Sequence, residues 1–329
     1  MRESFITSRK IPLVIEPTGG ISFDEFLKYV DENRDELRAK ILKHTGVLFR
    51  GFPIEGADGF NRVIEVLGLG EQLNYIGGDS PRDKVKGQVY TSTEAPPSLK
   101  IPLHNEMSFV KHYPRHIYFY SDIPASSGGA TILGDAREIY EKVRPDVRKA
   151  FEEKGVRYVS NYYRHDILLD IINKFQRAHK RWMEVFETDE KAVVEQRCKE
   201  SEFAYQWRKD WLEVVQEAKG VLDHVETGER VWFNQAHLYD YNPRLVGFWN
   251  YLGVKLVYAR PHTVMHEVCY GDGSRIPRKD LYHVMDVMDQ CTIDYPWQKN
   301  DMLILDNVLA MHGRAPFKGK RKTLTALTK

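Results

Sequence analysis

The arrangement of its apolar strands places the strongest constraint on the fold of this chain. Short runs rich in β-branched and aromatic residues occur in two groups, separated by a charged stretch at about residues 170–220. The runs lie at residues 46–52, 116–121, 130–133, 230–234, 301–306 and 321–327. Apolar residues within the charged stretch recur at helical spacing, which predicts a helical insertion with a solvated face. We therefore expect an antiparallel barrel or jelly roll that carries a helical insertion.

Helix signals flank the first strands. Ser22 and Glu25 have the spacing of a capping box and precede apolar residues at helical spacing, so we expect one helix that ends near Thr45. Residues 57–67 have the pattern of a second helix, and Asp135 is placed to cap a third. The chain shows no internal repeat and no low-complexity linker.

Charge and composition exclude several classes of protein. The 329 residues include 48 Lys and Arg against 47 Asp and Glu, a net charge of +1, which argues against a general nucleic-acid binder. A hydrophobic content of 42% argues against a disordered chain. No apolar run approaches the roughly 18 to 20 residues of a membrane helix, and the first residues lack the apolar core of a signal peptide. We therefore expect a cytoplasmic protein with neither a membrane nor a nucleic-acid partner.

Histidine is plentiful and cysteine is scarce, with 12 His against 3 Cys. This balance favours a metal site of nitrogen and oxygen ligands over one of thiolates. The strongest local signal is His104-Asn105-Glu106. On a strand, residues two apart face the same side, so His104 and Glu106 can reach one ion together. A distant third His would complete a two-His, one-carboxylate triad, which leaves three adjacent positions open on Fe(II).

The motif alone is weak, because about one or two His-x-acid matches are expected by chance in a chain with this many His. A second match begins at His224 and is followed by a polar turn at residues 227–229, where an ion would be open to water. His104 lies instead beside an apolar and aromatic run, where the core of a jelly roll is expected. We therefore prefer the match at His104 as the ligand pair.

The C-terminal end supplies the third His. His312 follows a strongly apolar strand, and residues 316–320 form a turn before Arg321 opens a last strand. An Arg placed across a tight turn from a metal-binding His can hold a carboxylate bidentately within reach of the ion. The alternative for Arg321 is a solvated basic tail, because lysines surround it, and this alternative stays open.

Five ordered blocks carry a family resemblance. They are His104-Asn105-Glu106-Met107-Ser108, Tyr113-Pro114-Arg115, Gly128-Gly129-Ala130-Thr131, Trp232-Phe233-Asn234-Gln235, and the ending that runs from Pro296 through Asp306-Asn307 to His312-Gly313-Arg314-Ala315-Pro316-Phe317. These blocks resemble the TauD/TfdA family of Fe(II)/2-oxoglutarate-dependent dioxygenases, and its SyrP-like and clavaminate-synthase-like branch in particular. The resemblance spans most of the chain, from about Gly46 to Leu327.

The resemblance implies an α+β fold, in which a double-stranded β-helix related to the cupins carries flanking helices and the insertion within a single domain at residues 1–329. It implies the following ligands: His104, Glu106 and His312 for the iron, and Thr131 and Arg321 for 2-oxoglutarate. Many relatives have two adjacent Arg residues where this chain has Arg321-Lys322. The two side chains face opposite sides of a strand, and we choose Arg321 because its guanidinium binds a carboxylate bidentately.

For function, the resemblance implies an enzyme that uses Fe(II), 2-oxoglutarate and O2 to hydroxylate an unactivated C–H bond of an amino acid or amino-acid derivative, in natural-product biosynthesis. The substrate is a small molecule, free or carrier-bound, and no catalytic residue is expected beyond the iron ligands. The carboxylate of Glu106 argues against a halogenase, in which a small residue leaves room for chloride. Desaturation, epoxidation and cyclisation at the same iron stay open, as do a non-catalytic jelly-roll binding protein and the oligomeric state.

Four residues are candidate substrate contacts. Tyr75 and Arg82 precede the His104 block, Asn234 lies on an expected core strand, and Arg314 lies two residues after His312. Arg residues suit a substrate that bears a carboxylate. Each candidate has an ordinary structural alternative, which is aromatic packing for Tyr75, a surface loop for Arg82, a satisfied core amide for Asn234 and an ion pair for Arg314.

Overall fold

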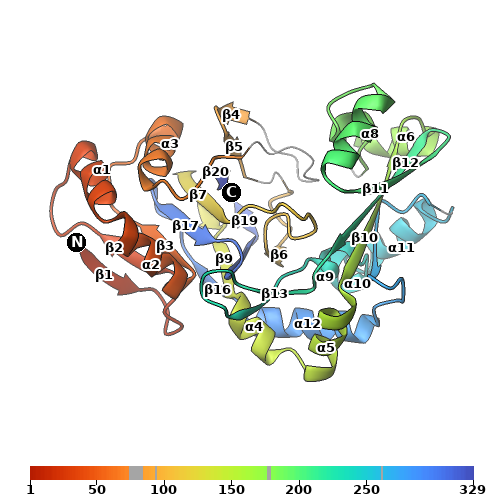
Figure 1. Cartoon of the computed structure of the whole chain (residues 1–329). Helices are drawn as coiled ribbons and strands as arrows, with labels where there is room; N and C mark the ends of the chain where they lie inside the picture. The colour runs from red at the N-terminus through yellow and green to blue at the C-terminus, as the bar shows by residue number, and fades with distance from the viewer. Residues whose placement is uncertain (74–83, 93–94, 176–178, 261) are drawn as a thin grey trace.

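Two facing β-sheets form the centre of the computed structural model, which describes residues 1–73, 84–92, 95–175, 179–260 and 262–329 (Figure 1). The larger sheet has the strand order β1-β2-β3-β17-β7-β20-β5-β4. Its strands are β1 (Arg2–Phe5), β2 (Leu13–Glu16), β3 (Gly46–Phe49), β17 (Met302–Asp306), β7 (His116–Ile123), β20 (Lys322–Thr328), β5 (Val89–Thr91) and β4 (Lys84–Lys86). The smaller sheet has the order β16-β9-β18-β6. Its strands are β16 (Ile293–Tyr295), β9 (Thr131–Asp135), β18 (Ala310–Arg314) and β6 (Ile101–His104).

Side-chain alternation on β17 shows how the larger sheet serves two layers. Leu303 and Leu305 face the smaller sheet and pack in one buried cluster with Leu133 of β9. Ile304 faces the other way and packs in a second buried cluster with Phe26 of the N-terminal helices. Apart from the parallel pair β2 and β3, the described pairings within both sheets are antiparallel. The predicted jelly-roll core is therefore confirmed.

Three helices cover the outer face of the larger sheet (Figure 1). They are α1 (Phe23–Glu32), α2 (Arg34–His44) and α3 (Gly56–Leu67). The predicted capping box is present at the start of α1, where Ser22 and Glu25 bond reciprocally. The single helix predicted to run to Thr45 is instead two helices, because the chain leaves helical geometry at Asn33, whose side-chain amide donates to the carbonyl of Tyr29 at 2.7 Å.

The outer face of the smaller sheet is covered by α4 (Ala136–Lys142) and α12 (Arg278–Cys291). Ile132 of the sheet, Ile139 of α4 and Val284 of α12 belong to one buried cluster. Asp135 caps α4 as predicted, because its carboxylate accepts a hydrogen bond from the backbone N–H of Arg137 at 2.9 Å. Since helices cover both outer faces, the space between the two sheets is where a site enclosed by the jelly roll has to lie.

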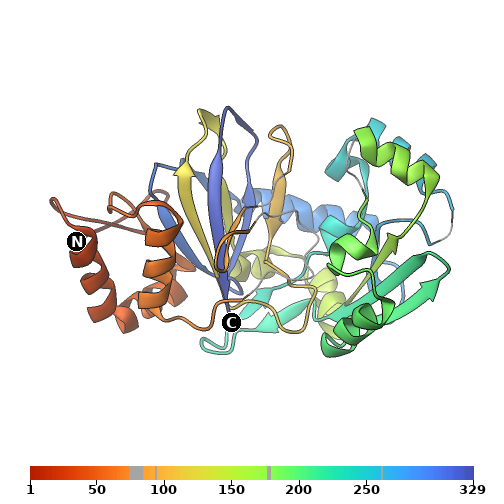
Figure 2. The same ribbon diagram turned by 90° about the horizontal axis from the view of Figure 1, so that it is seen from above.

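A second lobe lies beside the jelly roll (Figure 2) and is built on a sheet with the order β11-β12-β10-β15. Its strands are β11 (Ala204–Arg208), β12 (Trp211–Ala218), β10 (Val156–Tyr163) and β15 (His266–Tyr270). The helical insertion predicted at about 170–220 is therefore wrong in its second half. Its helices are α6 (Ile167–Phe175), α7 (Trp182–Val185) and α8 (Lys191–Glu200), and a β-hairpin follows them. Burial along β12 alternates with a period of two, which its interspersed charged residues concealed in the sequence.

Short elements complete the fold. They are α5 (Pro145–Lys154), α9 (Ala236–Tyr239), α10 (Pro243–Val246), α11 (Phe248–Val257), β13 (Val221–Asp223) paired with β14 (Arg230–Trp232), and β8 (Ser127–Gly128) paired with β19 (Phe317–Lys318). Among the residues that the structure describes, none of the helices combines the length and the apolar character that a bilayer crossing requires.

The layer assignment of β17 makes a prediction about stability. Replacing Ile304, which is fully buried between β3 and β7, by Ala is expected to lower the free energy of unfolding by about 2–5 kcal/mol, because it removes buried methylene groups and leaves a cavity. Val225→Ala is the control, since Val225 is 74% exposed, and should stay within about 0.5 kcal/mol of the parent. Urea denaturation measures both. Equal effects of the two substitutions would contradict the assignment.

Candidate metal centre

The pairing of β6 with β18 places two histidines opposite each other. His104 is the last residue of β6, His312 lies in the middle of β18, and the two are direct partners in the antiparallel register. Their ring centroids lie 4.4 Å apart. Phe119 of β7 packs against His312, with 5.2 Å between the ring centroids. Two histidines from distant parts of the chain therefore meet through one strand pair.

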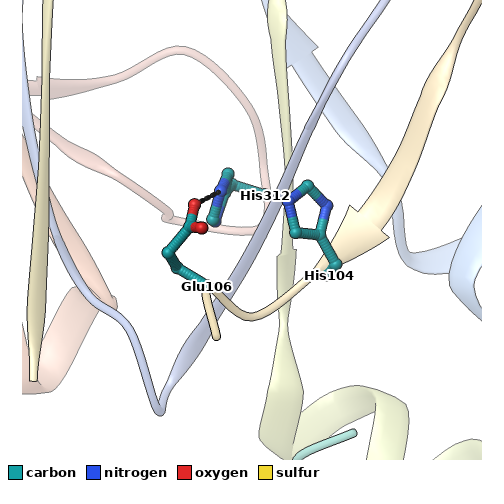
Figure 3. Close-up of side chains that lie close together, drawn as sticks. All are labelled: His104, Glu106 and His312. Carbon is teal, nitrogen blue, oxygen red and sulfur yellow. Dashed lines mark ion pairs between the residues drawn. The ribbon is translucent and has the colours of Figure 1, made fainter. Parts of the chain in front are cut away.

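Glu106 completes the cluster from a turn rather than from a strand (Figure 3). Because β6 ends at His104, the strand alternation by which we placed Glu106 on the same face does not reach it, and that part of the prediction is wrong. The carboxylate still points at His312, and Glu106 Oε2 lies 3.7 Å from His312 Nε2. One possible ligand atom from each of the three residues lies within 4.8 Å of the other two.

The protonation state of His104 suits a divalent metal. His104 Nδ1 lies 2.9 Å from the carbonyl oxygen of Pro102, which makes Nδ1 the donor and leaves the Nε2 lone pair for a metal. Burial, followed by repulsion from His312, lowers the pKa of His104 to about 3, so its ring is neutral at physiological pH. Two imidazoles and one carboxylate match the facial triad that binds Fe(II).

Thr131 brings a directed hydroxyl to the same place. Its Oγ1 accepts a hydrogen bond from Trp297 Nε1 at 3.1 Å. Because an indole N–H only donates, the Thr131 hydroxyl can still donate a hydrogen bond to another group. Thr131 lines the cavity that His104 and His312 also line. An anionic ligand in this cavity would accept that hydrogen bond.

Arg321 brings a positive charge to this cavity. Its Nε donates to the carbonyl of Gly129 at 3.0 Å, and the described residues place no carboxylate within ion-pair distance of it. Burial, together with repulsion from Arg314, lowers the pKa of Arg321 to about 10. Gly129 permits the approach, since it has a φ of +72° and a Cβ there would lie 3.2 Å from Arg321 Cδ. The half-buried guanidinium is therefore placed to bind an anion.

The neighbouring Lys322 faces elsewhere. Its ammonium pairs with Asp122 of β7 at 2.8 Å, and its side chain is 45% exposed. Of the adjacent pair Arg321-Lys322, the residue that lines the cavity is therefore Arg321, and the alternative of a solvated tail does not apply to it.

Arg314 also lines the cavity, but backbone carbonyls already occupy its guanidinium. It donates to the carbonyls of Ala95 at 3.0 Å, Pro96 at 2.7 Å and Leu99 at 3.0 Å. Its predicted role as a substrate contact is replaced by a structural one, because these bonds tie the segment at residues 95–99 to β18.

Asn234 is likewise used by the fold. Its Nδ2 donates to the carbonyl of Gly220 at 2.8 Å, and its Oδ1 accepts from the N–H of Ala236 at 3.1 Å. Both ends of the amide are satisfied by backbone, so we no longer assign Asn234 to the substrate. The other two candidates, Tyr75 and Arg82, lie outside the described residues.

In the second His-x-acid match, His224 is buried, whereas Glu226 and the predicted polar turn at residues 227–229 are exposed. His224 Nε2 donates to the Asp306 carboxylate at 3.1 Å, and its Nδ1 accepts from the N–H of Thr227 at 3.2 Å. Glu226 pairs with Arg38 and Arg115. Within the described part of the chain, His104, Glu106 and His312 form the one group of three that could hold a metal. The preference for the match at His104 agrees with this geometry.

The sequence assigned no role to three polar residues that contact the site. Trp297 orients Thr131, Asn307 bonds the backbone of Glu106, and Gln235 bonds the backbone of Asn105. All three belong to the motif blocks quoted above. The three bonds leave no local signal in the sequence, because each joins residues that are distant along the chain.

Comparison with known proteins decides the family. The model of the family described as "Taurine catabolism dioxygenase TauD, TfdA family" matches residues 7–328. The chain belongs to this family. A clavaminate synthase-like protein of Arabidopsis thaliana is 30% identical over 333 residues, which cover 98% of this chain and 94% of that protein. The dapdiamide synthesis protein DdaC of Enterobacter agglomerans is 30% identical over 321 residues, which cover 96% of this chain and 90% of that protein.

The fold agrees with that membership. The crystal structure of a taurine dioxygenase from Burkholderia xenovorans superposes with a TM-score of 0.52 at 15% identity, covering 97% of this chain and 85% of that one. TauD/TfdA enzymes use Fe(II), 2-oxoglutarate and O2. The protein is therefore a 2-oxoglutarate-dependent non-haem iron dioxygenase.

The orientations of Arg321 and Lys322 make a prediction about this TauD/TfdA enzyme. Arg321→Ala should weaken 2-oxoglutarate binding at least roughly tenfold, because a hydrogen bond to a charged group contributes about 1.5–3 kcal/mol. Lys322→Ala is the matched control and should leave binding unchanged, since Lys322 pairs with Asp122. Calorimetric titration of 2-oxoglutarate into metal-loaded protein measures both. A larger loss in Lys322→Ala than in Arg321→Ala would reverse the assignment.

Proposed function

We propose that this dioxygenase hydroxylates an unactivated C–H bond of an amino acid or amino-acid derivative in natural-product biosynthesis. The observation that carries the proposal is the pairing of two features in one cavity. One is the pair His104 and His312, which Glu106 completes as a possible metal site, and the other is the half-buried Arg321, which lacks an acidic partner among the described residues. The first suits Fe(II), and the second suits the far carboxylate of 2-oxoglutarate.

Each residue has a part in the proposal. His104, Glu106 and His312 would hold the iron. Arg321 and Thr131 hold the carboxylate of 2-oxoglutarate that lies away from the metal. When bound, the iron and 2-oxoglutarate supply the oxidising chemistry. The balanced reaction converts R–H, 2-oxoglutarate and O2 into R–OH, succinate and CO2.

The substrate class is supported by a relative and by a cavity. The 30% identical DdaC is named for dapdiamide synthesis, which is a biosynthetic role of that protein. A cavity of about 370 Å³ lies between the jelly roll and the second lobe and is lined in part by Met107, the residue after Glu106. Met107 has a φ of +54°, an uncommon conformation for a residue other than glycine that is enriched at functional sites.

The lining of this cavity suits a small amino-acid derivative. Apolar side chains line most of it: Leu73, Met107, Val110, Val185, Phe186, Phe203 and Leu327. Charges of both signs accompany them, with Lys111 and Arg197 positive and Glu200 negative. An apolar body with an ammonium group and a carboxylate is the kind of molecule that such a lining accommodates. We therefore place the substrate in this cavity.

The proposed reaction is tested by its products. Purified protein with Fe(II) and 2-oxoglutarate should form succinate only when O2 is present, and a screen of amino acids by mass spectrometry should find a product that has gained one oxygen atom. Glu106→Ala should abolish succinate formation, because it removes the carboxylate of the triad. Full turnover by Glu106→Ala would refute the ligand assignment. Loss of two hydrogens from the substrate instead would replace hydroxylation by desaturation or cyclisation.

Filling the cavity tests the placement of the substrate. Val110→Trp should lower substrate-dependent turnover several-fold and leave the succinate formed without substrate unchanged, because the cavity lies apart from Thr131 and Arg321. Val225→Trp, on the exposed surface, is the control and should change neither rate. Unchanged substrate turnover in Val110→Trp would place the substrate elsewhere.

A further inference from the structure

The position of Glu106 needs an explanation that strand geometry does not supply. β6 ends at His104, and Glu106 lies in the turn that follows it. A residue past a strand end lacks the neighbouring backbone that would hold its N–H and C=O in place. Glu106 is nevertheless buried, and its carboxylate points at His312.

The side chain of Asn307 takes the place of that missing strand neighbour. Asn307 Oδ1 accepts a hydrogen bond from the N–H of Glu106 at 2.7 Å, and Asn307 Nδ2 donates to the C=O of Glu106 at 2.9 Å. A carboxamide has the donor and acceptor of a peptide group, so it pairs with both backbone groups of one residue as a strand would. Nδ2 also donates to the carbonyl of Pro114 at 2.8 Å. Asn307 has no exposed surface, so water does not compete for these bonds.

Further side-chain bonds hold Asn105, the residue before Glu106. Asn105, inside the His-x-Glu motif, donates from Nδ2 to the carbonyls of Asn307 at 2.7 Å and Ala310 at 3.2 Å. Gln235 Nε2 donates to the carbonyl of Asn105. These bonds tie the turn that carries Glu106 to the loop that leads into the strand of His312.

That loop is itself anchored by a buried acid. Asp306 Oδ1 accepts from the N–H groups of Val308 at 2.8 Å and Leu309 at 2.9 Å, and its Oδ2 accepts from His224 at 3.1 Å. Asp306 therefore fixes the loop at residues 307–309, and with it the position of Asn307 beside Glu106.

We propose that Asn307 is a positioning residue of the metal centre, which sets the carboxylate of Glu106 against His312 by pairing with the Glu106 backbone, and that Gln235 supports it through Asn105. The inference rests on the metal centre proposed above. Partners beyond the ligands orient them, and their removal typically lowers metal affinity about 10–100-fold.

The test measures metal affinity apart from turnover. Co(II) is the probe, and its binding to the full chain is followed by calorimetry and by its visible absorption, with thermal unfolding recorded for each variant. Asn307→Leu keeps a similar volume and removes the three bonds of the amide. We expect its Co(II) affinity to fall roughly 10–100-fold at temperatures where the protein is folded.

A matched control separates positioning from general stability. Asn242 is also fully buried and makes three backbone bonds, to the carbonyl of Asp240 and from the N–H groups of Arg244 and Leu245. Asn242→Leu should lower the unfolding temperature and leave Co(II) affinity unchanged. If Asn307→Leu does not fold, Gln235→Met, which removes only the bond to Asn105, decides and should also weaken Co(II) binding.

Two results would overturn different parts of the account. Co(II) affinity as tight as that of the parent in Asn307→Leu, or in Gln235→Met where the first does not fold, would make these residues merely structural. Glu106→Ala is measured alongside them. If Glu106→Ala also binds Co(II) as tightly as the parent, the proposed metal centre fails, and the positioning role fails with it.

Discussion

The register between β6 and β18 is the constraint on which the rest of the site depends. A slip of one residue in this pairing would turn His104 and every other side chain of β6 to the opposite face of the sheet. With the observed register, His104 lies directly opposite His312. The same strand β18 pairs with β9 on its other side, where Arg314 lies opposite Thr131. One strand therefore aligns the candidate metal ligands with the candidate 2-oxoglutarate contacts.

The polar groups in the cavity that are not fully paired within the protein indicate which kind of ligand the cavity binds. Burying a charged group without a partner is costly, and proteins keep such groups mainly where a ligand completes them. Arg321 is half-buried and carries a charge without an acidic partner among the described residues, because its bond to the Gly129 carbonyl does not neutralise that charge. Thr131 accepts a hydrogen bond from Trp297, and its hydroxyl can still donate one to a ligand. Arg314, by contrast, directs its two terminal nitrogens to three backbone carbonyls and so stabilises the chain itself.

Much of the fold and the metal triad could be predicted from the sequence, since apolar strands and helix caps are local signals. The capping box at Ser22 and the cap at Asp135 are present as predicted. The hairpin at residues 204–218 was missed because interspersed charged residues conceal the alternation of buried and exposed positions along its strands. The burial of His224 was missed because its partner, Asp306, is distant in sequence and adjacent only in the fold.

The site itself illustrates the limit of local patterns. Spacing alone suggested that Glu106 shares a strand face with His104, whereas Glu106 lies in a turn. Its place is set by the amide of Asn307, about two hundred residues away, and such a pairing leaves no mark on the local sequence. The sequence alone therefore predicts the metal ligands but not the residues that orient them.

The central claim is that His104, Glu106 and His312 hold Fe(II) beside a 2-oxoglutarate that Arg321 secures. Anaerobic titration of Fe(II) and 2-oxoglutarate into the protein, followed by visible absorption, tests this most directly. The account predicts a charge-transfer band that needs both additions and disappears in Glu106→Ala. The absence of such a band in the parent protein, or its full persistence in Glu106→Ala, would contradict the account.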